Sequence, residues 1–220
     1  MIDHKLKKLE LKNCLANNLI FPSEIERIDL KIEPDEEITH LSRHKITEIA
    51  RAKMVDWMFE VIKAFKMSNQ TFFLSVQYMD RYFNMVKKCL EMGELHRIGI
   101  TCMFIASKFE DIIPLYLVTV ADKIAHGRIS KQQILDQERD ICAALDFKLA
   151  AVPTVFDFLD FYLTSKVIRK HPDIKIVTLF AHYLAYIQVH HIQFCQRNGS
   201  LMAVCCIYVS LNVVQTMRNT

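Results

Sequence analysis

The chain has 220 residues, of which 51% are hydrophobic and 24% charged, and its formal net charge is +3. This length and apolar content predict a globular protein with a real core and exclude a disordered chain. The near-balanced charge lacks the strong basic bias of a non-specific nucleic-acid binder. The chain has only 4 glycines and 5 prolines, which favours helices over an architecture of many strands.

The seven cysteines form no C-x-x-C pair and mostly lie in apolar stretches, as reduced thiols of nuclear or cytoplasmic proteins do. The charged N-terminus has no apolar core of a signal peptide. The longest apolar run, Leu201 to Val214, is broken by Ser210 and Asn212, and we expect it to be too short for a bilayer. These features predict a nuclear or cytoplasmic protein without nucleic-acid or membrane partners.

Hydrophobic periodicity divides the chain into an N-terminal arm and two groups of helices. Residues 1–44 carry short, weak helical patterns that we expect to be ordered only by packing on the helices after them. Strong helical spacing then continues almost to the C-terminus, with breaks at glycines and prolines. The predicted helices of residues 45–150 run from about 47 to 65, across 72–83, 95–112, 115–125 and 131–145; those of residues 151–220 run across 153–162, 172–189 and 198–214.

The predicted helix over residues 95–112 is apolar on nearly every side, which is typical of a helix at the centre of a bundle. Gly99 within it indicates a close approach by a neighbouring backbone. Lys108 comes late in the same helix, where its amine must reach either water or a partner.

No motif for catalysis is present. The chain has no phosphate-binding glycine loop and no G-x-S-x-G or H-E-x-x-H sequence. Glu110 and Asp111 are adjacent, but no nucleophile or histidine accompanies them, so we expect a solvated pair. His191 and Cys195 could lie one helical turn apart, yet further metal ligands are missing. We therefore predict no enzyme activity, no cofactor and no metal site.

Four charged residues lie near apolar stripes of the predicted helices. Lys108 and Glu138, on the third and fifth helices, would each be ordinary surface charges if considered alone. Arg51 and Asp80, on the first and second helices, could form a bidentate ion pair inside the bundle. We expect this second pair to be structural, because it would fix how the two helices align.

Four segments carry a family resemblance when they are read in order. They are Arg51–Trp57 (RAKMVDW), Gln77–Phe83 (QYMDRYF), Ala106–Pro114 (ASKFEDIIP), and Leu145–Leu149 (LDFKL) together with Pro153–Leu159 (PTVFDFL). With this spacing the chain resembles the cyclins, most closely the A and B types. The resemblance implies an all-α cyclin fold. It consists of a complete five-helix cyclin box at residues 45–150 and a shortened second box of about three helices at 151–220.

The resemblance also implies a regulatory subunit that binds a cyclin-dependent protein kinase and activates it in cell-cycle control. In that family the positions of Lys108 and Glu138 hydrogen-bond the kinase around its C helix, whose position controls activity. Apolar neighbours receive the same helix: Ile105, Phe109, Cys142, Phe147 and Leu149.

Many cyclins also have a docking patch for substrates or inhibitors on the first helix. The positions that match it are Met54, Trp57, Glu60 and Leu95. However, Ala50, Lys53 and His96 depart from the usual methionine, aliphatic residue and glutamine, and we expect Lys53 to weaken docking of a basic motif. Arg97 replaces a usual leucine without a reason visible in the sequence. An adaptor of the cyclin fold that activates no kinase is the main alternative, and a DNA-binding transcription factor of the same fold is a distant third.

Overall fold

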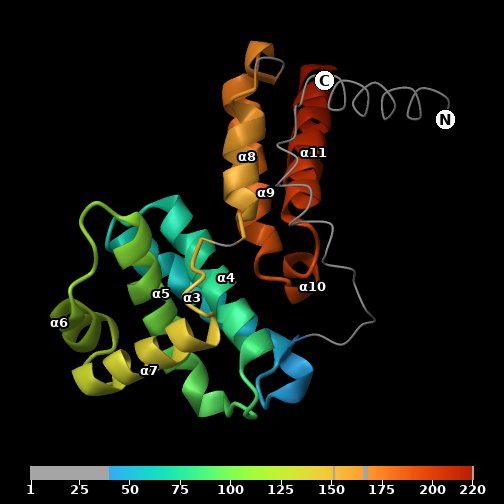
Figure 1. The fold of residues 1–220 in the computed structure, drawn as a ribbon. Helices are drawn as coiled ribbons and strands as arrows, with labels where there is room; N and C mark the ends of the chain where they lie inside the picture. The colour runs from blue at the N-terminus through green and yellow to red at the C-terminus, as the bar shows by residue number, and fades with distance from the viewer. Residues whose placement is uncertain (1–39, 151, 166–167, 220) are drawn as a thin grey trace.

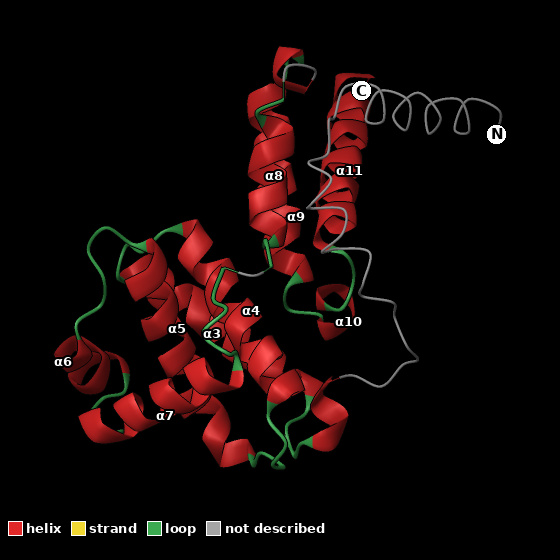
Figure 2. Cartoon of the chain, in the orientation of Figure 1, coloured by secondary structure: helices red, strands yellow, loops and turns green. Residues whose placement is uncertain are grey.

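The computed structural model of the chain describes residues 40–150, 152–165 and 168–219. These ranges contain helices and turns but no strand, which confirms the all-α class. The helices form two groups that meet near the middle of α4 (Figure 1, Figure 2). Residues 1–39 of the predicted arm lie outside the described residues, and its last part contains the short 3-10 helix η1 (His40–Arg43).

The first group contains the five predicted helical segments. Its elements are α3 (Glu48–Ala64), α4 (Asn69–Met85), α5 (Leu95–Glu110), α6 (Leu117–Thr119) with its π-helical continuation η3 (Val120–Ile124), and α7 (Lys131–Ala144); the 3-10 turn η2 (Met92–Glu94) precedes α5. The fourth segment begins later than predicted, because the backbone is still extended at Tyr116. The side chains of Thr47, Ser68 and Ser130 cap α3, α4 and α7 by accepting backbone N–H bonds.

Helix α5 lies at the centre of the first group, as its apolar sequence predicts, and packs against α3, α4 and α7. Nearly all of its residues from Leu95 to Ser107 are buried. The close neighbour of Gly99 is a side chain and not a backbone: the methyl group of Met54 on α3 occupies the space that a Cβ atom would need. A glycine at this position therefore lets α3 and α5 pack tightly.

The second group consists of three long helices that pack on one another. They are α8 (Val155–Leu163), α9 (Ile174–Gln188) and α11 (Gly199–Asn219), with the shorter η4 (Ile168–Lys170) and α10 (Ile192–Cys195) between them. Their number agrees with the sequence prediction. Figure 1 shows them standing together above the first group, with α8 beside the upper end of α4.

The predicted end of α11 at Val214 is wrong, because the helix continues to Asn219. Its segment Gly199–Arg218 has 20 residues and contains an 18-residue window with a mean hydropathy of 1.6, so by length and composition alone it could cross a membrane. The sequence argument that this run is too short therefore fails. One such helix is weak evidence for a membrane span, and in the structure α11 packs against α8 and α9.

Candidate functional site

Lys108 and Glu138 come together in the structure across the contact between α5 and α7. The Lys108 ammonium donates directly to the Glu138 carboxylate, and the lysine Nζ also lies 4.2 Å from the centre of the Phe104 ring. The Lys108 side chain is 40% exposed and that of Glu138 17% exposed. The pair thus sits at the surface but is partly shielded from water, where charge-assisted hydrogen bonds are stronger than in the open solvent.

The five apolar residues predicted around this pair divide into two layers. Ile105 and Cys142 are 2% and 8% exposed and belong to the core beneath the pair. Phe109 is 48% exposed and Phe147 is 73% exposed, so these two rings offer surface to a partner. Leu149 is half-buried and packs on the core.

The backbone just after α7 explains why Phe147 points outward. Asp146 and Phe147 both have positive φ, at 53° and 55°, a conformation that L-residues rarely adopt. The Phe147 N–H donates to the Cys142 carbonyl at 2.9 Å, which closes the C-terminal turn of the helix. This turn keeps a large aromatic ring exposed beside the buried Cys142, whose thiol has a pKa raised by burial and by the nearby Glu138.

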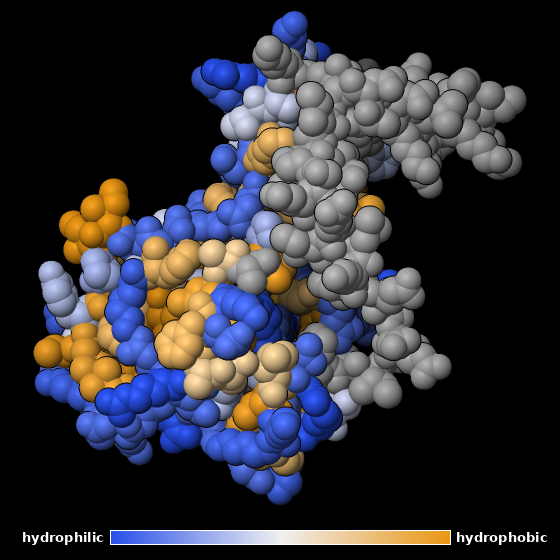
Figure 3. Space-filling model, in the orientation of Figure 1, coloured by the Kyte–Doolittle hydropathy of each residue, from blue (hydrophilic) through white to orange (hydrophobic). Residues whose placement is uncertain are grey.

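The segment after α5 adds exposed apolar residues that the sequence prediction did not include. Ile112 is 100% exposed, Ile113 78% and Tyr116 69%. Figure 3 shows hydrophobic surface over the loop that joins α5 to α6 and around α6. We call Lys108, Glu138, Phe109, Phe147, Ile112, Ile113 and Tyr116 the α5–α7 face. A run of isoleucines directly before Pro114, where a helix must end, was the signal that could have identified this extension.

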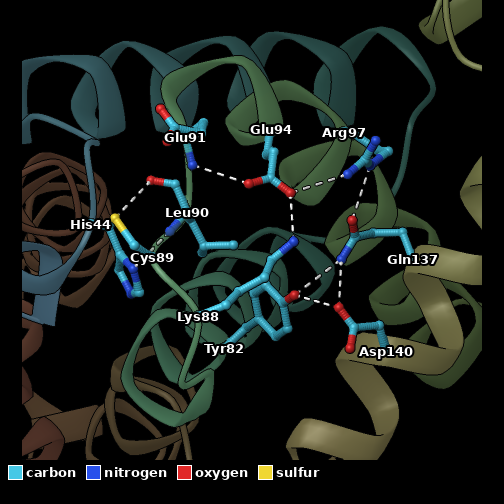
Figure 4. Close-up of polar contacts among 10 residues, drawn as sticks. All are labelled: His44, Tyr82, Lys88, Cys89, Leu90, Glu91, Glu94, Arg97, Gln137 and Asp140. Atoms are coloured by element: carbon cyan, nitrogen blue, oxygen red, sulfur yellow. Dashed lines mark hydrogen bonds and ion pairs between the residues drawn. The ribbon is translucent and has the colours of Figure 1, made fainter.

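Arg97, which the sequence left unexplained, joins α5 to α7 through a polar network (Figure 4). Its Nε donates to Gln137 Oε1 at 3.0 Å and its Nη2 to Glu94 Oε1 at 3.3 Å. Gln137 donates onward to the Tyr82 hydroxyl at 3.3 Å, and that hydroxyl donates to Asp140 at 2.5 Å. Burial, together with Asp140, raises the pKa of Tyr82, so the hydroxyl stays a donor. The network fixes α7, and with it Glu138, against α4 and α5.

The predicted docking patch is only partly accessible. Met54 and Leu95 are buried, Trp57 is half-buried, and Glu60 is exposed. The ring of His96 lies over Trp57 with 4.6 Å between the ring centres, so His96 covers part of the surface that the tryptophan would offer. Lys53 is exposed on the same helix. That this patch is altered stays a prediction, and the contact between His96 and Trp57 gives it a geometric basis.

Arg51 and Asp80 form the bidentate pair expected between α3 and α4. Arg51 Nε donates to Asp80 Oδ1 at 2.7 Å and Nη2 to Oδ2 at 2.5 Å, and the arginine is fully buried. Its Nη1 also donates to the carbonyls of Val189 and His190, at 2.9 and 3.2 Å. Burial opposes the charge of Arg51, but the Asp80 carboxylate outweighs it and raises the arginine pKa. The pair thus joins both helical groups, which the sequence did not reveal.

The two residues considered for a metal do not converge. Cys195 Sγ accepts from Arg51 Nη2 at 3.4 Å and donates to the Val189 carbonyl at 3.5 Å, although the residue as a whole is exposed. The His191 ring instead packs against Phe194. Among the described residues no group of three or more metal-ligating side chains occurs.

The family model of the N-terminal domain of cyclins matches residues 23–150 of the chain. The chain belongs to the cyclin family. The fold agrees with this, because it matches the X-ray structure of a viral cyclin from herpesvirus saimiri with a TM-score of 0.70. The two chains are 19% identical, and the match covers 87% of this chain and 82% of the viral one. The matched domain begins at residue 23, before the boundary at residue 45 that the sequence predicts.

Curated relatives are cyclins of several types. The chain is 34% identical over 122 residues to the G1/S-specific cyclin-E of Drosophila melanogaster, covering 56% of this chain and 17% of the relative. It is 32% identical over 142 residues to cyclin-A2 of Xenopus laevis (64% and 33%), and 24% identical over 191 residues to cyclin-A1-4 of Oryza sativa subsp. japonica (87% and 52%). This cyclin thus spans about half or less of the length of these relatives.

Proposed function

We propose that this cyclin is a regulatory subunit that binds a cyclin-dependent protein kinase through the α5–α7 face and activates it in cell-cycle control. Activation results if the face binds only the kinase conformation whose C helix is turned inward, because binding then shifts the population toward the active state. The protein would act where such kinases act, in the nucleus or the cytoplasm.

The observation that carries the proposal is the placement of a charged pair within an exposed apolar surface. Phe109, Phe147 and Ile112 are exposed and available to bury against a helix. Lys108 directly precedes Phe109 on α5, and its partner Glu138 lies on α7, which ends shortly before Phe147. Such a surface fits an interface in which a few desolvated anchors and charge-assisted bonds supply most of the affinity. Exposed apolar patches of this kind mark interaction sites on soluble proteins.

The pair can keep its own contact and still bind a kinase. Lys108 uses one N–H on Glu138, which leaves ammonium donors and carboxylate lone pairs for a bound kinase that offers both an acceptor and a donor at the same place. Backbone carbonyl and N–H groups at a helix end offer both. This requirement gives the site a geometric specificity that a lone charge would lack.

An affinity measurement with Lys108→Ala and Glu138→Ala tests the proposal. Calorimetric titration into a panel of purified cyclin-dependent kinases is expected to show a tight complex with at least one of them. Each substitution should weaken that complex by about 30-fold or more, as at interface hot spots. Lys45→Ala, which removes an exposed lysine that is paired with Glu91 and lies on neither α5 nor α7, is the matched control and should leave the affinity unchanged. Equal affinity of all variants contradicts the proposed role of the pair.

The main alternative is an adaptor of the cyclin fold that activates no kinase. The mutual pairing of Lys108 and Glu138 and the covering of Trp57 by His96 both favour it, because each reduces what the two family surfaces offer. Mass spectrometry of proteins that co-purify with the native chain separates the two functions. A kinase among them supports the regulatory subunit, and a stable complex with only non-kinase partners supports the adaptor.

A further inference from the structure

A cavity of about 270 Å³ lies where the two helical groups meet. One wall is the face of α4 that carries Gln77, Asp80 and Arg81, and the others come from the segment before α8 and from the α9–α11 region. Its apolar lining includes Phe73, Val76, Val155, Val189, Phe194 and Met202. A volume near the lower end of ligand-site volumes, with apolar walls and a few polar groups, is the usual form of a small binding site.

Two polar atoms of this wall are buried without a hydrogen-bond partner: Gln77 Oε1, an acceptor, and Arg81 Nη1, a donor. The two residues are four apart on α4 and therefore lie on one face of the helix. Their other polar atoms are in use, since Arg81 Nη2 donates to the Lys148 carbonyl at 2.8 Å and Gln77 Nε2 to the Pro153 carbonyl at 3.5 Å. Buried polar atoms of this kind are nearly always satisfied, so an open donor and an open acceptor on one helix face fit a ligand that offers both an acceptor and a donor.

The charge of the cavity is positive. No carboxylate among the described residues pairs with Arg81, and burial lowers the pKa of its guanidinium. Asp80 faces the same cavity, but Arg51 occupies both of its carboxylate oxygens. Arg197, an exposed residue of the lining, adds a second positive charge. A partly desolvated cation without a counter-ion is costly, and an anionic ligand would relieve that cost.

We propose that this cavity binds an acidic side chain, aspartate or glutamate, that a partner presents within a peptide beside an apolar residue. The carboxylate accepts from Arg81 Nη1, and a backbone N–H of the same peptide donates to Gln77 Oε1. The apolar neighbour packs between Phe73 and the other hydrophobic walls. A free carboxylate satisfies only Arg81, so a peptide fits the pair of open groups better. The cavity shares no residue with the α5–α7 face, and its occupancy does not depend on kinase binding.

Two short probes test the proposal on the full chain. The peptide acetyl-Leu-Glu-amide and its glutamine analogue acetyl-Leu-Gln-amide are titrated into isotope-labelled protein and followed by NMR. The glutamate peptide is expected to shift the signals of the Gln77 side-chain amide and the Arg81 guanidinium and to bind about tenfold more tightly than its analogue. Acetate alone should bind about as weakly as the analogue. Equal affinity of the two peptides, or shifts elsewhere only, overturns the proposal.

The variant Gln77→Glu places a carboxylate one helical turn before Arg81 and supplies the missing counter-ion from within the chain. It is expected to raise the melting temperature and to abolish binding of the glutamate peptide. Gln215→Glu makes the same charge change at an exposed position of α11 and should do neither. Arg81→Gln should reduce the affinity for the glutamate peptide to that of the glutamine analogue. If Gln77→Glu leaves both the melting temperature and binding unchanged, Arg81 is not an open anion site.

Discussion

Helices α5 and α9 are both strongly apolar, yet α5 is buried on almost every side and α9 only on one. Around α5 three helices close the core, so its hydrophobic residues are buried on almost every side. On α9 only one stripe is buried, which contains Val177, Ala181 and Ala185. A second stripe stays exposed, and none of the described residues covers it: Ile176, Leu179, Tyr183 and Ile187. The comparison teaches that an all-round apolar sequence predicts a central helix only where enough neighbours are present to surround it.

Arg51→Ala should give the largest loss of stability, because the Arg51 side chain connects the first group of helices (α3–α7) to the second (α8–α11). Its removal leaves the Asp80 carboxylate without its guanidinium partner and takes the stronger of two donors from the Val189 carbonyl. We expect the free energy of unfolding to fall by about 3–5 kcal/mol, as for other broken buried ion pairs. Denaturation by urea measures this loss. A loss no larger than that of an exposed variant such as Lys45→Ala would show that the pair does not hold the groups together.

Two leucines of the second group sharpen the contrast between its buried and exposed stripes. Leu159 on α8 is completely buried, and its replacement by alanine should cost about 2–5 kcal/mol. Leu179 on α9 is 69% exposed, and the same replacement should change stability by about 0.5 kcal/mol or less. Thermal or urea unfolding compares the two variants. A large loss for Leu179→Ala would show that another part of the protein or a second molecule covers the α9 stripe in solution.

Gly99→Ala tests how tightly the first group is closed around α5. The new methyl group would collide with the side chain of Met54, so we expect a loss of about 1–2 kcal/mol although alanine favours helices. Gly93→Ala is the control, because nothing lies within 4 Å of its Cβ position. The Met54→Ala change should restore part of the loss in a double-mutant cycle. Stabilisation of the protein by Gly99→Ala would mean that α3 and α5 are not in close contact there.

Each of the two helical groups contains a histidine whose pKa is lowered in the folded state. This predicts a small effect of pH on the stability of the fold. Burial lowers the pKa of His96, and the nearby Arg128 and His126 add to this; burial likewise lowers the pKa of His182. Unfolded histidine therefore binds protons at a higher pH than the folded form does. The stabilisation is complete above the usual histidine pKa of about 6.5 and is lost as the pH falls below it. Melting temperatures at about pH 7.5 and pH 5.5 should differ less in His96→Gln than in the unchanged protein, and an equal difference would contradict this role of His96.

Most of the fold could be predicted from the periodicity of hydrophobic residues and from the capping residues, glycines and prolines at helix ends. The boundaries of α3, α7 and α8 agree with the capping residues Thr47, Ser130 and Thr154, because a cap is a local interaction. The end of α11 could not be predicted, since no glycine or proline marks it and the helix simply continues past Val214. Sequence signals predict the end of a helix well where a capping residue or a helix breaker lies at that end.

The resemblance named the charged pair and the two exposed rings, Phe109 and Phe147, but not the exposed Ile112, Ile113 and Tyr116. The family motifs singled out Lys108 and Glu138, but their direct contact depends on how α5 and α7 pack. The same holds for Arg97, which looks out of place in an apolar helix until Gln137 and Glu94 are seen beside it. The link from Arg51 to Val189 joins residues 138 positions apart, and no pattern within either segment could reveal it.

Activation of a cyclin-dependent kinase tests the role of the α5–α7 face most directly. Phosphorylation of a peptide substrate by a purified kinase is measured at increasing concentrations of this cyclin. The unchanged cyclin and its Glu138→Ala variant are tested separately. We predict that activity rises with cyclin concentration to a plateau and that the variant needs about 30-fold more protein to reach it. No rise with any kinase that binds the chain, or identical curves for both proteins, would contradict regulation through this face.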